Sequence, residues 1–499
     1  MNSLVLAEKT KFRYAQLADH LAGQIREGVW QAGEQLPSVR QMSQQQGLSI
    51  GTVSQAYYLL ADQDLVEVRP QSGYYVRPST RPTNPLPKLT APSEQPQSAL
   101  TDQIADLIAK VYGQLSGSEA VQYSVTGITP GLFPTARLGR ALQKAVHELP
   151  HGGIAYGNVQ GDALLRRQIA RHALHWSGLH LTEHELVTAE GCSTAMAYCL
   201  RALTRPGDTV AIESPAYFAV LQLAVSLGLQ VLELPTSPSS GVELPALEAQ
   251  LAQGRVQVCL FTPSFSNPMG SLMPEAHRQQ LVRLLDRYDV PLIEDDVYGE
   301  TYFGKQRPRP CKAFDQQGRV LWCSSVSKTL APGYRVGWVA PGRYLEQVKR
   351  VKFHHTVASP ILMQRAIGIF MATGHYDLYL NRLRRYLHAN YLAYLQALRT
   401  YFPAGVRISQ PAGGFILWIE LDERLNTQRL YHEAMQQRIS IAPGQMFTLH
   451  GQYNHCFRLS YGIPFGPLVE KALRVLGELI AAQCNELAAC AGQVAAVAA

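Results

Sequence analysis

The sequence predicts two units of different fold class: a small helical head that ends in a β-hairpin, and a large α/β domain with a mainly parallel sheet. Three observations predict them. Helical patterns and a short hairpin pattern fill residues 12–77, six prolines fall within residues 78–98, and short apolar runs alternate with helical stretches over residues 101–480. The length of 499 residues exceeds what one hydrophobic core usually holds, which agrees with several domains.

The head, residues 12–77, shows the order helix, helix, helix, hairpin. Pro37 and Ser38 begin the second helix, and Gly47 follows its end. Ser49 is the expected N-cap of the third helix, and "LVEVR" and "YYVR" form two strands around a glycine-containing turn. This order is typical of a winged helix-turn-helix, whose third helix enters the major groove of DNA. An unspecific bundle of three helices with a hairpin is the alternative.

The rest of the chain divides into a linker, a domain and a tail. Residues 78–100 form a proline-rich, semi-extended linker, because proline blocks helices and sheet ladders. Residues 101–480 contain apolar runs such as "DTVAIE", "VQVCLFT" and "VPLIEDD" between helical stretches, which predicts parallel strands joined by helices. Residues 481–499 are an alanine-rich tail, either helix or frayed end, to which we assign no role.

The composition narrows the class of protein. The chain has no apolar run of eighteen residues and no signal-peptide pattern, so we expect a cytoplasmic protein without a membrane span. Its eight cysteines form no CxxC pairs or Cys/His clusters, which indicates reduced thiols and no metal site. The net charge is +7, but residues 1–80 hold seven Lys or Arg and seven Asp or Glu. A DNA-binding head must therefore use a few well-placed cations rather than bulk charge.

A lysine in a loop of small hydroxylic residues marks the candidate chemical site. Lys328 lies within "SSVSKTLAPGYRVGW". A neutral lysine amine held near a carbonyl group can form a Schiff base with pyridoxal 5′-phosphate, PLP. The phosphate of PLP favours helix N-termini, hydroxyl groups and cations. The candidate phosphate ligands are Ser193 and Thr194, which open a helix after a glycine, together with Ser325 and Arg335.

Four further residues match the ring of PLP. Asp295 ends a buried apolar strand and can keep the pyridine nitrogen protonated, Tyr298 and Asn267 can bond the phenolic oxygen, and Tyr217 can stack on the ring. Taken singly, each has an ordinary alternative: a strand-end carboxylate, a turn former before proline, or a core aromatic. Their joint occurrence, in this order around Lys328, predicts a PLP site.

The head resembles that of GntR-type regulators. The resemblance lies in "LPSVRQ", in the spacing of Ser49 and Thr52, and in the wing "VRPQSGYYV". It implies that Arg40, Ser49, Thr52 and Gly73 face DNA. The chain departs from this family at Ile50, where a basic residue is common.

The large domain resembles fold-type I PLP enzymes of the class I aminotransferase group over most of residues 120–480. The matching segments are "AYGNVQGDALLRRQIA", "RPGDTVAIESPAY", "GGFILWIEL" and "FRLSYG". The resemblance implies that Tyr156 reaches across a dimer interface toward the phosphate of the partner subunit's PLP. It also implies that Arg458 grips the α-carboxylate of a ligand.

Head, linker and large domain together resemble the MocR subfamily of bacterial regulators. This implies a homodimeric, PLP-dependent transcriptional regulator that binds double-stranded operator DNA, with Lys328 at the centre of a sensor for an amine or amino acid. A catalytically active aminotransferase with an accessory DNA-binding head is the alternative, because every residue that transamination needs is present. An interaction module with a vestigial PLP site is a third reading, and the intact Lys328, Asp295, Arg335 and Arg458 argue against it.

Overall fold

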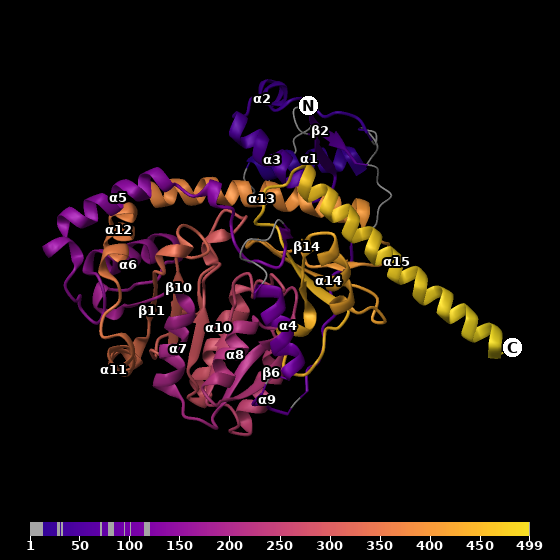
Figure 1. The fold of residues 1–499 in the computed structure, drawn as a ribbon. Helices are drawn as coiled ribbons and strands as arrows, with labels where there is room; N and C mark the ends of the chain where they lie inside the picture. The colour runs from indigo at the N-terminus through magenta and orange to yellow at the C-terminus, as the bar shows by residue number, and fades with distance from the viewer. Residues whose placement is uncertain are drawn as a thin grey trace. The chain divides into compact units, whose positions relative to one another are not determined.

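The chain divides into two compact units, Met1–Thr83 and Asn84–Ala499 (Figure 1). The computed structural model describes residues 13–498, except 27–29, 31–32, 70–71, 78–83, 94, 100 and 114–119. Within these described residues, no helix combines the length and the apolar character that a membrane crossing requires.

The head folds into three helices and a hairpin: α1 (Arg13–Arg26), α2 (Val39–Gln46), α3 (Ile50–Asp62), β1 (Val66–Arg69) and β2 (Gly73–Val76). Ser38 caps α2 by accepting a hydrogen bond from the amide of Gln41, and Gly47 ends it in the left-handed conformation. Helix α3 buries Val53, Ala56, Tyr57 and Leu60. The predicted wing turn includes residues 70–71, which lie outside the described residues. The order of elements confirms a winged helix-turn-helix.

An eight-stranded sheet forms the centre of the second unit. Its strands lie in the order β4, β11, β10, β9, β8, β5, β6, β7. Neighbours from β10 to β6 pair in parallel, whereas β11 and β7 are antiparallel to the strands beside them. This confirms the predicted α/β class. In chain order the strands are β4 (Val187–Ala189), β5 (Thr209–Ser214), β6 (Gln230–Ser237), β7 (Gly241–Val242), β8 (Val258–Phe261), β9 (Leu292–Asp295), β10 (Val320–Ser325) and β11 (Gly337–Ala340).

Helices cover both faces of this sheet. Val258 and Leu260 of β8 join the core on one face, and Cys259 and Phe261 join the core on the other. Strands covered on both faces are apolar throughout, which explains the continuous apolar runs in the sequence. The first face holds α7 (Cys192–Leu203) and α8 (Phe218–Ser226), and the second holds α9 (Leu244–Ala252) and α10 (Glu275–Tyr288). Further helices are α5 (Thr135–Glu148), α6 (Ala163–Ser177), α11 (Leu345–Thr356), α12 (Ile361–Ala372) and α13 (His375–Tyr401).

A smaller sheet follows in the last part of the chain. Its order is β12, β13, β16, β15, and β14 pairs separately with β3. Helix α15 continues to Ala498, so the alanine-rich tail is part of a helix (Figure 1). The remaining elements are α4 (Asp102–Gly113), β3 (Val121–Gln122), β12 (Arg407–Ile408), β13 (Ile416–Glu420), α14 (Thr427–Gln436), β14 (Ile439–Ser440), β15 (Ala442–Pro443), β16 (Cys456–Ser460) and α15 (Pro467–Ala498).

The described residues of 84–99, called the strap below, hydrogen-bond to both sheets of the second unit. The amide of Lys88 donates to a carboxylate oxygen of Glu420 at 2.7 Å, at the end of β13. Gln97 and Val231 of β6 exchange two backbone hydrogen bonds of 2.9 and 2.7 Å. The strap therefore runs from the smaller sheet to the larger one. Other parts of the predicted linker, residues 78–83, 94 and 100, lie outside the described residues.

Candidate functional site

Lys328 lies in the loop between β10 and the short 3-10 helix η6 (Pro332–Tyr334). Its Nζ donates hydrogen bonds to the backbone oxygen of Thr126 at 2.7 Å and to the Thr126 hydroxyl at 3.2 Å. Burial, and then the nearby guanidinium of Arg458, lower the pKa of Lys328 to about 8. A larger fraction of this amine is therefore neutral near neutral pH than of an ordinary lysine. Thr126 was not predicted, because no sequence pattern connects it with this loop.

Asp295 is brought to the same place by the sheet. It is the last residue of β9, which pairs in parallel with β10, and the carboxyl ends of neighbouring parallel strands share one edge. Its Oδ1 accepts hydrogen bonds from Sγ of Cys192 at 3.3 Å and from the amide of Val297 at 3.1 Å. Burial raises the pKa of Asp295 to about 6. The hydrogen bonds from Cys192 and Val297 therefore do not fully offset the loss of water around the ionised carboxylate.

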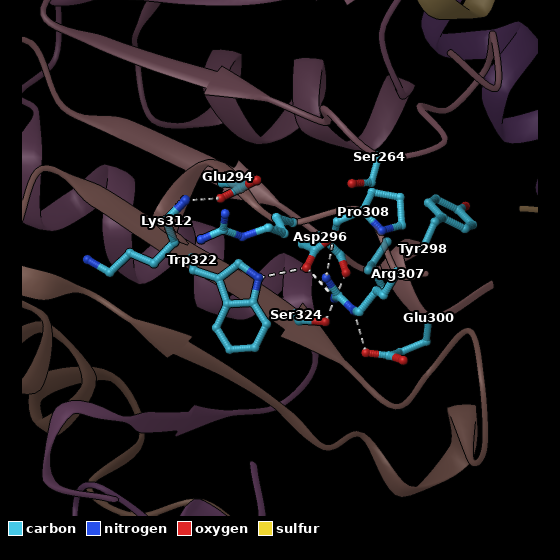
Figure 2. Close-up of polar contacts among 12 residues, drawn as sticks. Ser264, Glu294, Asp296, Tyr298, Glu300, Arg307, Pro308, Lys312, Trp322 and Ser324 are labelled. Atoms are coloured by element: carbon cyan, nitrogen blue, oxygen red, sulfur yellow. Dashed lines mark hydrogen bonds and ion pairs between the residues drawn. The ribbon is translucent and has the colours of Figure 1, made fainter. Parts of the chain in front are cut away.

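The next carboxylate, Asp296, belongs to a buried network of its own (Figure 2). Its Oδ2 accepts hydrogen bonds from Nη2 of Arg307 at 2.5 Å and from Nε1 of Trp322 at 2.7 Å. Nε of Arg307 also donates to Glu300 at 2.7 Å. These bonds hold both ends of the segment 296–300, which contains Tyr298. This network was not predicted from the sequence. The run "EDD" was a signal for it, because successive side chains at a strand end point in different directions.

The candidate phosphate end lies between α7 and the loop after Lys328. Arg335 donates from Nη2 to the backbone oxygen of Glu190 at 2.9 Å and from Nη1 to the hydroxyl of Ser327 at 3.3 Å. A Cβ on Gly191, whose φ is +100°, would lie 2.4 Å from Arg335 Nη2, so a side chain there would displace the guanidinium. Ser193 and Thr194 lie in the first turn of α7, and Ser325 ends β10. Ser327 is an addition to the predicted set.

The candidate ring partners lie around Lys328 and Arg458. Tyr298 is buried, and its ring centroid is 5.9 Å from Lys328 Nζ. Asn267 is buried, and its Oδ1 accepts a hydrogen bond from Nη1 of Arg458 at 3.0 Å. Tyr217 is the N-cap residue that precedes α8, and burial raises its pKa to about 12. Both tyrosines are therefore neutral phenols that can donate a proton to a neighbouring acceptor.

Arg458 is fully enclosed, with 0% of its surface exposed, on β16 of the smaller sheet. Besides Asn267, it donates from Nη2 to the hydroxyl of Tyr112 at 3.2 Å and to the backbone oxygen of Ser124. Its buried Nε–H has no hydrogen-bond partner among the described residues. Tyr112 comes from α4 and was not predicted, because α4 precedes every recognised motif of the domain.

The donor set fits PLP. A protonated pyridine needs a buried anion, and Asp295 is a buried carboxylate whose pKa is raised by the loss of water around it. The phosphate needs hydroxyls, a helix N-terminus and a cation, which α7 and Arg335 supply. The predicted residue Tyr156 is 87% exposed in the single chain.

The predicted DNA-facing residues lie on three elements of the head. Ser49 caps α3 by accepting a hydrogen bond from the amide of Thr52 at 3.1 Å, and the two hydroxyls are 2.8 Å apart. Arg40 is exposed on α2. Gly73 opens β2 with a φ of +114°, which disfavours any side chain there. Ile50, where the chain departs from the GntR pattern, is 55% exposed in the first turn of α3.

Comparison with known proteins agrees with this geometry. Residues 130–466 match the family of class I and II aminotransferases, and residues 13–76 match the bacterial regulatory proteins of the gntR family. The chain is 36% identical to YjiR and 37% identical to YdcR, two uncharacterized HTH-type transcriptional regulators of Escherichia coli (strain K12). The alignments cover 94% of this chain in both cases, and 98% and 99% of the relatives.

Among solved structures, the fold is similar to LysN, the α-aminoadipate aminotransferase of Thermus thermophilus, crystallised with N-(5′-phosphopyridoxyl)-L-leucine. The TM-score is 0.69 at 26% identity, over 77% of this chain and 97% of LysN. The chain therefore belongs to the gntR family of DNA-binding transcriptional regulators, and to those members that carry a class I and II aminotransferase domain, which is the architecture of MocR-type regulators.

Proposed function

We propose that the aminotransferase-like domain of this regulator binds PLP on Lys328 and senses an amine or amino acid, which changes how the head engages operator DNA. The observation that carries the proposal is the gathering of three groups in one site: the half-buried amine of Lys328 with its lowered pKa, the buried carboxylate of Asp295 and the buried guanidinium of Arg458. Buried charges without direct ionic partners cost free energy. A ligand with complementary charges would offset this cost by pairing with the buried groups.

Each ring partner has a separate role in this proposal. Bound PLP would supply an electron-withdrawing ring and a carbonyl carbon that reacts with amines. Asp295 would hold the proton on the pyridine nitrogen, and Asn267 and Tyr298 would donate to the phenolic oxygen. Tyr217 would lie against the ring face, and Lys328 would carry the covalent attachment.

The phosphate would be held by the N-terminus of α7 and its neighbours. The residues concerned are Ser193, Thr194, Ser325 and Arg335, with Ser327 added from the structure. The partner subunit's Tyr156 would complete this end of the site. The proposal therefore includes a homodimer, in which each exposed Tyr156 reaches the other subunit.

The effector end and the head complete the proposal. Arg458 would bind the carboxylate of an amino-acid effector by charge-assisted hydrogen bonds. On DNA, the first turn of α3 would lie in the major groove and the hairpin would lie beside it. The residues that we assign to this contact are Arg40, Ser49, Thr52 and Gly73.

Chemical trapping tests the cofactor part. Borohydride reduction, digestion and mass spectrometry should find the cofactor on Lys328. Lys352 is an internal control, because loss of water also lowers its pKa to about 8, but it bonds Thr188 outside the site. Cofactor on Lys352, or on no lysine, would contradict the assignment.

Binding to DNA from upstream of the gene tests the sensor part. The Lys328→Ala protein should bind this DNA as the native protein does, because the head is a separate unit. It should lose the change in affinity that PLP with candidate amines or amino acids produces. A variant that keeps the full ligand response would refute the sensor.

A working aminotransferase is the second candidate, because Lys328, Asp295, Asn267 and Arg458 are all present and gathered together. Steady-state amino transfer at tens of turnovers per second, typical of enzymes, would favour it. Turnover far below that level would favour the sensor.

A further inference from the structure

The guanidinium that we assign to the effector is already occupied by groups of the chain. Nη2 of Arg458 donates to two acceptors, the hydroxyl of Tyr112 at 3.2 Å and the backbone oxygen of Ser124. Both of its hydrogens are therefore used. Nη1 donates to Asn267, and Nε–H lacks a partner among the described residues.

A carboxylate needs Nη2. An arginine can hold a carboxylate with two parallel hydrogen bonds along one of two edges. The end-on edge consists of Nη1 and Nη2, and the side-on edge consists of Nε and Nη2. Both edges include Nη2, so a ligand that binds Arg458 with two bonds must displace Tyr112 or Ser124.

Tyr112 is the partner that can leave. The oxygen of Ser124 is backbone, the residue is fully buried, and its hydroxyl is 2.6 Å from that of Ser440. Tyr112 is a side chain in the last turn of α4 and is only half-buried. Its hydroxyl also donates to the Ser124 oxygen at 3.2 Å. The phenol is a neutral acceptor, and a carboxylate makes stronger, charge-assisted bonds.

We propose that Tyr112 is a specificity residue of the effector site: its hydroxyl occupies Arg458 in the ligand-free protein and is displaced by the carboxylate of an amino-acid ligand. This inference rests on the proposed function and defines its ligand class further. Only a ligand with a carboxylate displaces Tyr112. An amine without a carboxylate binds in the site and leaves the hydrogen bond between Arg458 and Tyr112 in place.

Displacement of Tyr112 would affect other parts of the domain through the contacts of its ring and of helix α4. The ring of Tyr112 packs on Phe218, with centroids 4.8 Å apart, and Phe218 follows the ring-stacking candidate Tyr217. Ile104, Leu107, Ile108 and Val111 hold the rest of α4 in the core. The strap precedes α4 in the chain and contacts both sheets. Release of Tyr112 therefore loosens the element that lies between the effector site and the strap.

The test compares two ligands that differ only in the carboxylate. Full-length, cofactor-free protein is titrated with N-(5′-phosphopyridoxyl)-glycine and with N-(5′-phosphopyridoxyl)-methylamine. The ratio of the methylamine Kd to the glycine Kd is the carboxylate preference. Tyr112→Phe should raise this preference about three- to tenfold, because the variant removes one competing hydrogen bond and keeps the ring on Phe218. Tyr401→Phe, which removes a surface hydroxyl bonded to Glu470, should leave it unchanged.

The outcomes separate this inference from the function on which it rests. An unchanged or lowered preference in Tyr112→Phe overturns the inference, because the hydroxyl then does not compete with the ligand. Arg458→Ala should abolish the preference in either case. If it does not, Arg458 is not the carboxylate anchor, and the effector assignment fails first. If neither compound binds the native chain, the PLP site itself is refuted and the inference falls with it.

Discussion

At the scale of single residues, burial moves two groups at the carboxyl edge of the large sheet toward their neutral forms. It lowers the pKa of Lys328 to about 8 and raises the pKa of Asp295 to about 6. Both shifts have one cause, the loss of water around the charged form. Both shifts favour binding of a ligand that reacts with the neutral amine of Lys328 and places a cation beside the carboxylate of Asp295.

Lys328 should attach PLP with an unusual pH dependence. Only the neutral amine attacks a carbonyl, so the rate of attachment should rise with pH and reach half its maximum near pH 8, the pKa of this lysine. An ordinary lysine would reach that point near its usual pKa of about 10.4. Stopped-flow absorbance of cofactor-free protein mixed with PLP measures the profile. A midpoint near 10 would show that burial does not depress this pKa.

Asp295→Asn should stabilise the cofactor-free protein while weakening its affinity for PLP. A pKa raised from 3.8 to about 6 means that the folded state holds the ionised carboxylate at a cost of about 3 kcal/mol. The neutral amide of the variant would avoid this cost. The gain should be full above pH 6, shrink as the pH falls and Asp295 takes up a proton, and vanish below about 3.8.

Thermal unfolding at pH 7.5 and pH 5 measures this gain. Asp289→Asn is the matched control, because hydrogen bonds from Arg343 and Arg319 lower the pKa of this surface carboxyl. Removing the charge of Asp289 should lower the melting temperature slightly, whereas Asp295→Asn should raise it. A lower melting temperature for Asp295→Asn at pH 7.5 would contradict the argument.

At the scale of elements, the strap and α4 follow one another in the chain and both contact the core of the second unit. The strap bonds to the smaller sheet through Lys88 and Glu420 and to the larger sheet through Gln97 and Val231. Helix α4 follows it and ends beside Arg458. A segment with contacts on both sheets responds to any change in their separation, which a freely moving linker would not do.

Helix α4 should exchange its amide hydrogens faster when a carboxylate ligand is bound. The reason is the loss of the Tyr112 contact at its last turn. Hydrogen–deuterium exchange of peptides from residues 102–113 should rise with N-(5′-phosphopyridoxyl)-glycine and stay constant with N-(5′-phosphopyridoxyl)-methylamine. Peptides from α10, on the other face of the large sheet, should not respond to either compound. Equal exchange with both compounds would exclude α4 as the responding element.

At the scale of the whole molecule, a head without net charge is joined to a domain that carries the positive surplus. DNA affinity must then depend on single contacts in the head, because a few phosphate contacts set both the affinity and its dependence on salt. Arg40 is exposed on α2, and the N-terminus of α3 presents Ser49 and the exposed Ile50. The chain combines this DNA-binding head with the proposed ligand site in a separate unit.

Arg40→Ala should weaken DNA binding severalfold and flatten its salt dependence. Each lost phosphate contact should reduce the slope of log affinity against log salt by about 0.9. Titrations at several salt concentrations measure both effects, and PLP absorbance should remain unchanged. Arg201→Ala, which removes the same charge from an exposed position on α7, is the control. Equal losses in both variants would show that only total charge matters.

The sequence by itself determined the two fold classes and the candidate cofactor residues. Helix caps such as Ser38 and Gly47, and apolar runs such as that of β8, act through neighbours along the chain, so their effect can be read locally. Lys328 and Arg335 were recognisable for the same reason, since they lie in one short loop. The order of head, linker and domain is likewise a property of the chain itself.

Only the tertiary structure decided which distant residues complete the site. Thr126 accepts a hydrogen bond from Lys328, which lies 202 positions later in the chain. Tyr112 accepts one from Arg458, which lies 346 positions later. The sequence assigned Asp295 to the cofactor site, but it did not show that Asp296 bonds Arg307 and Trp322, because these contacts depend on packing. The strap was predicted as a linker from its prolines, but its bonds to both sheets depend on surfaces built elsewhere. Such contacts follow from packing, and no local pattern encodes them.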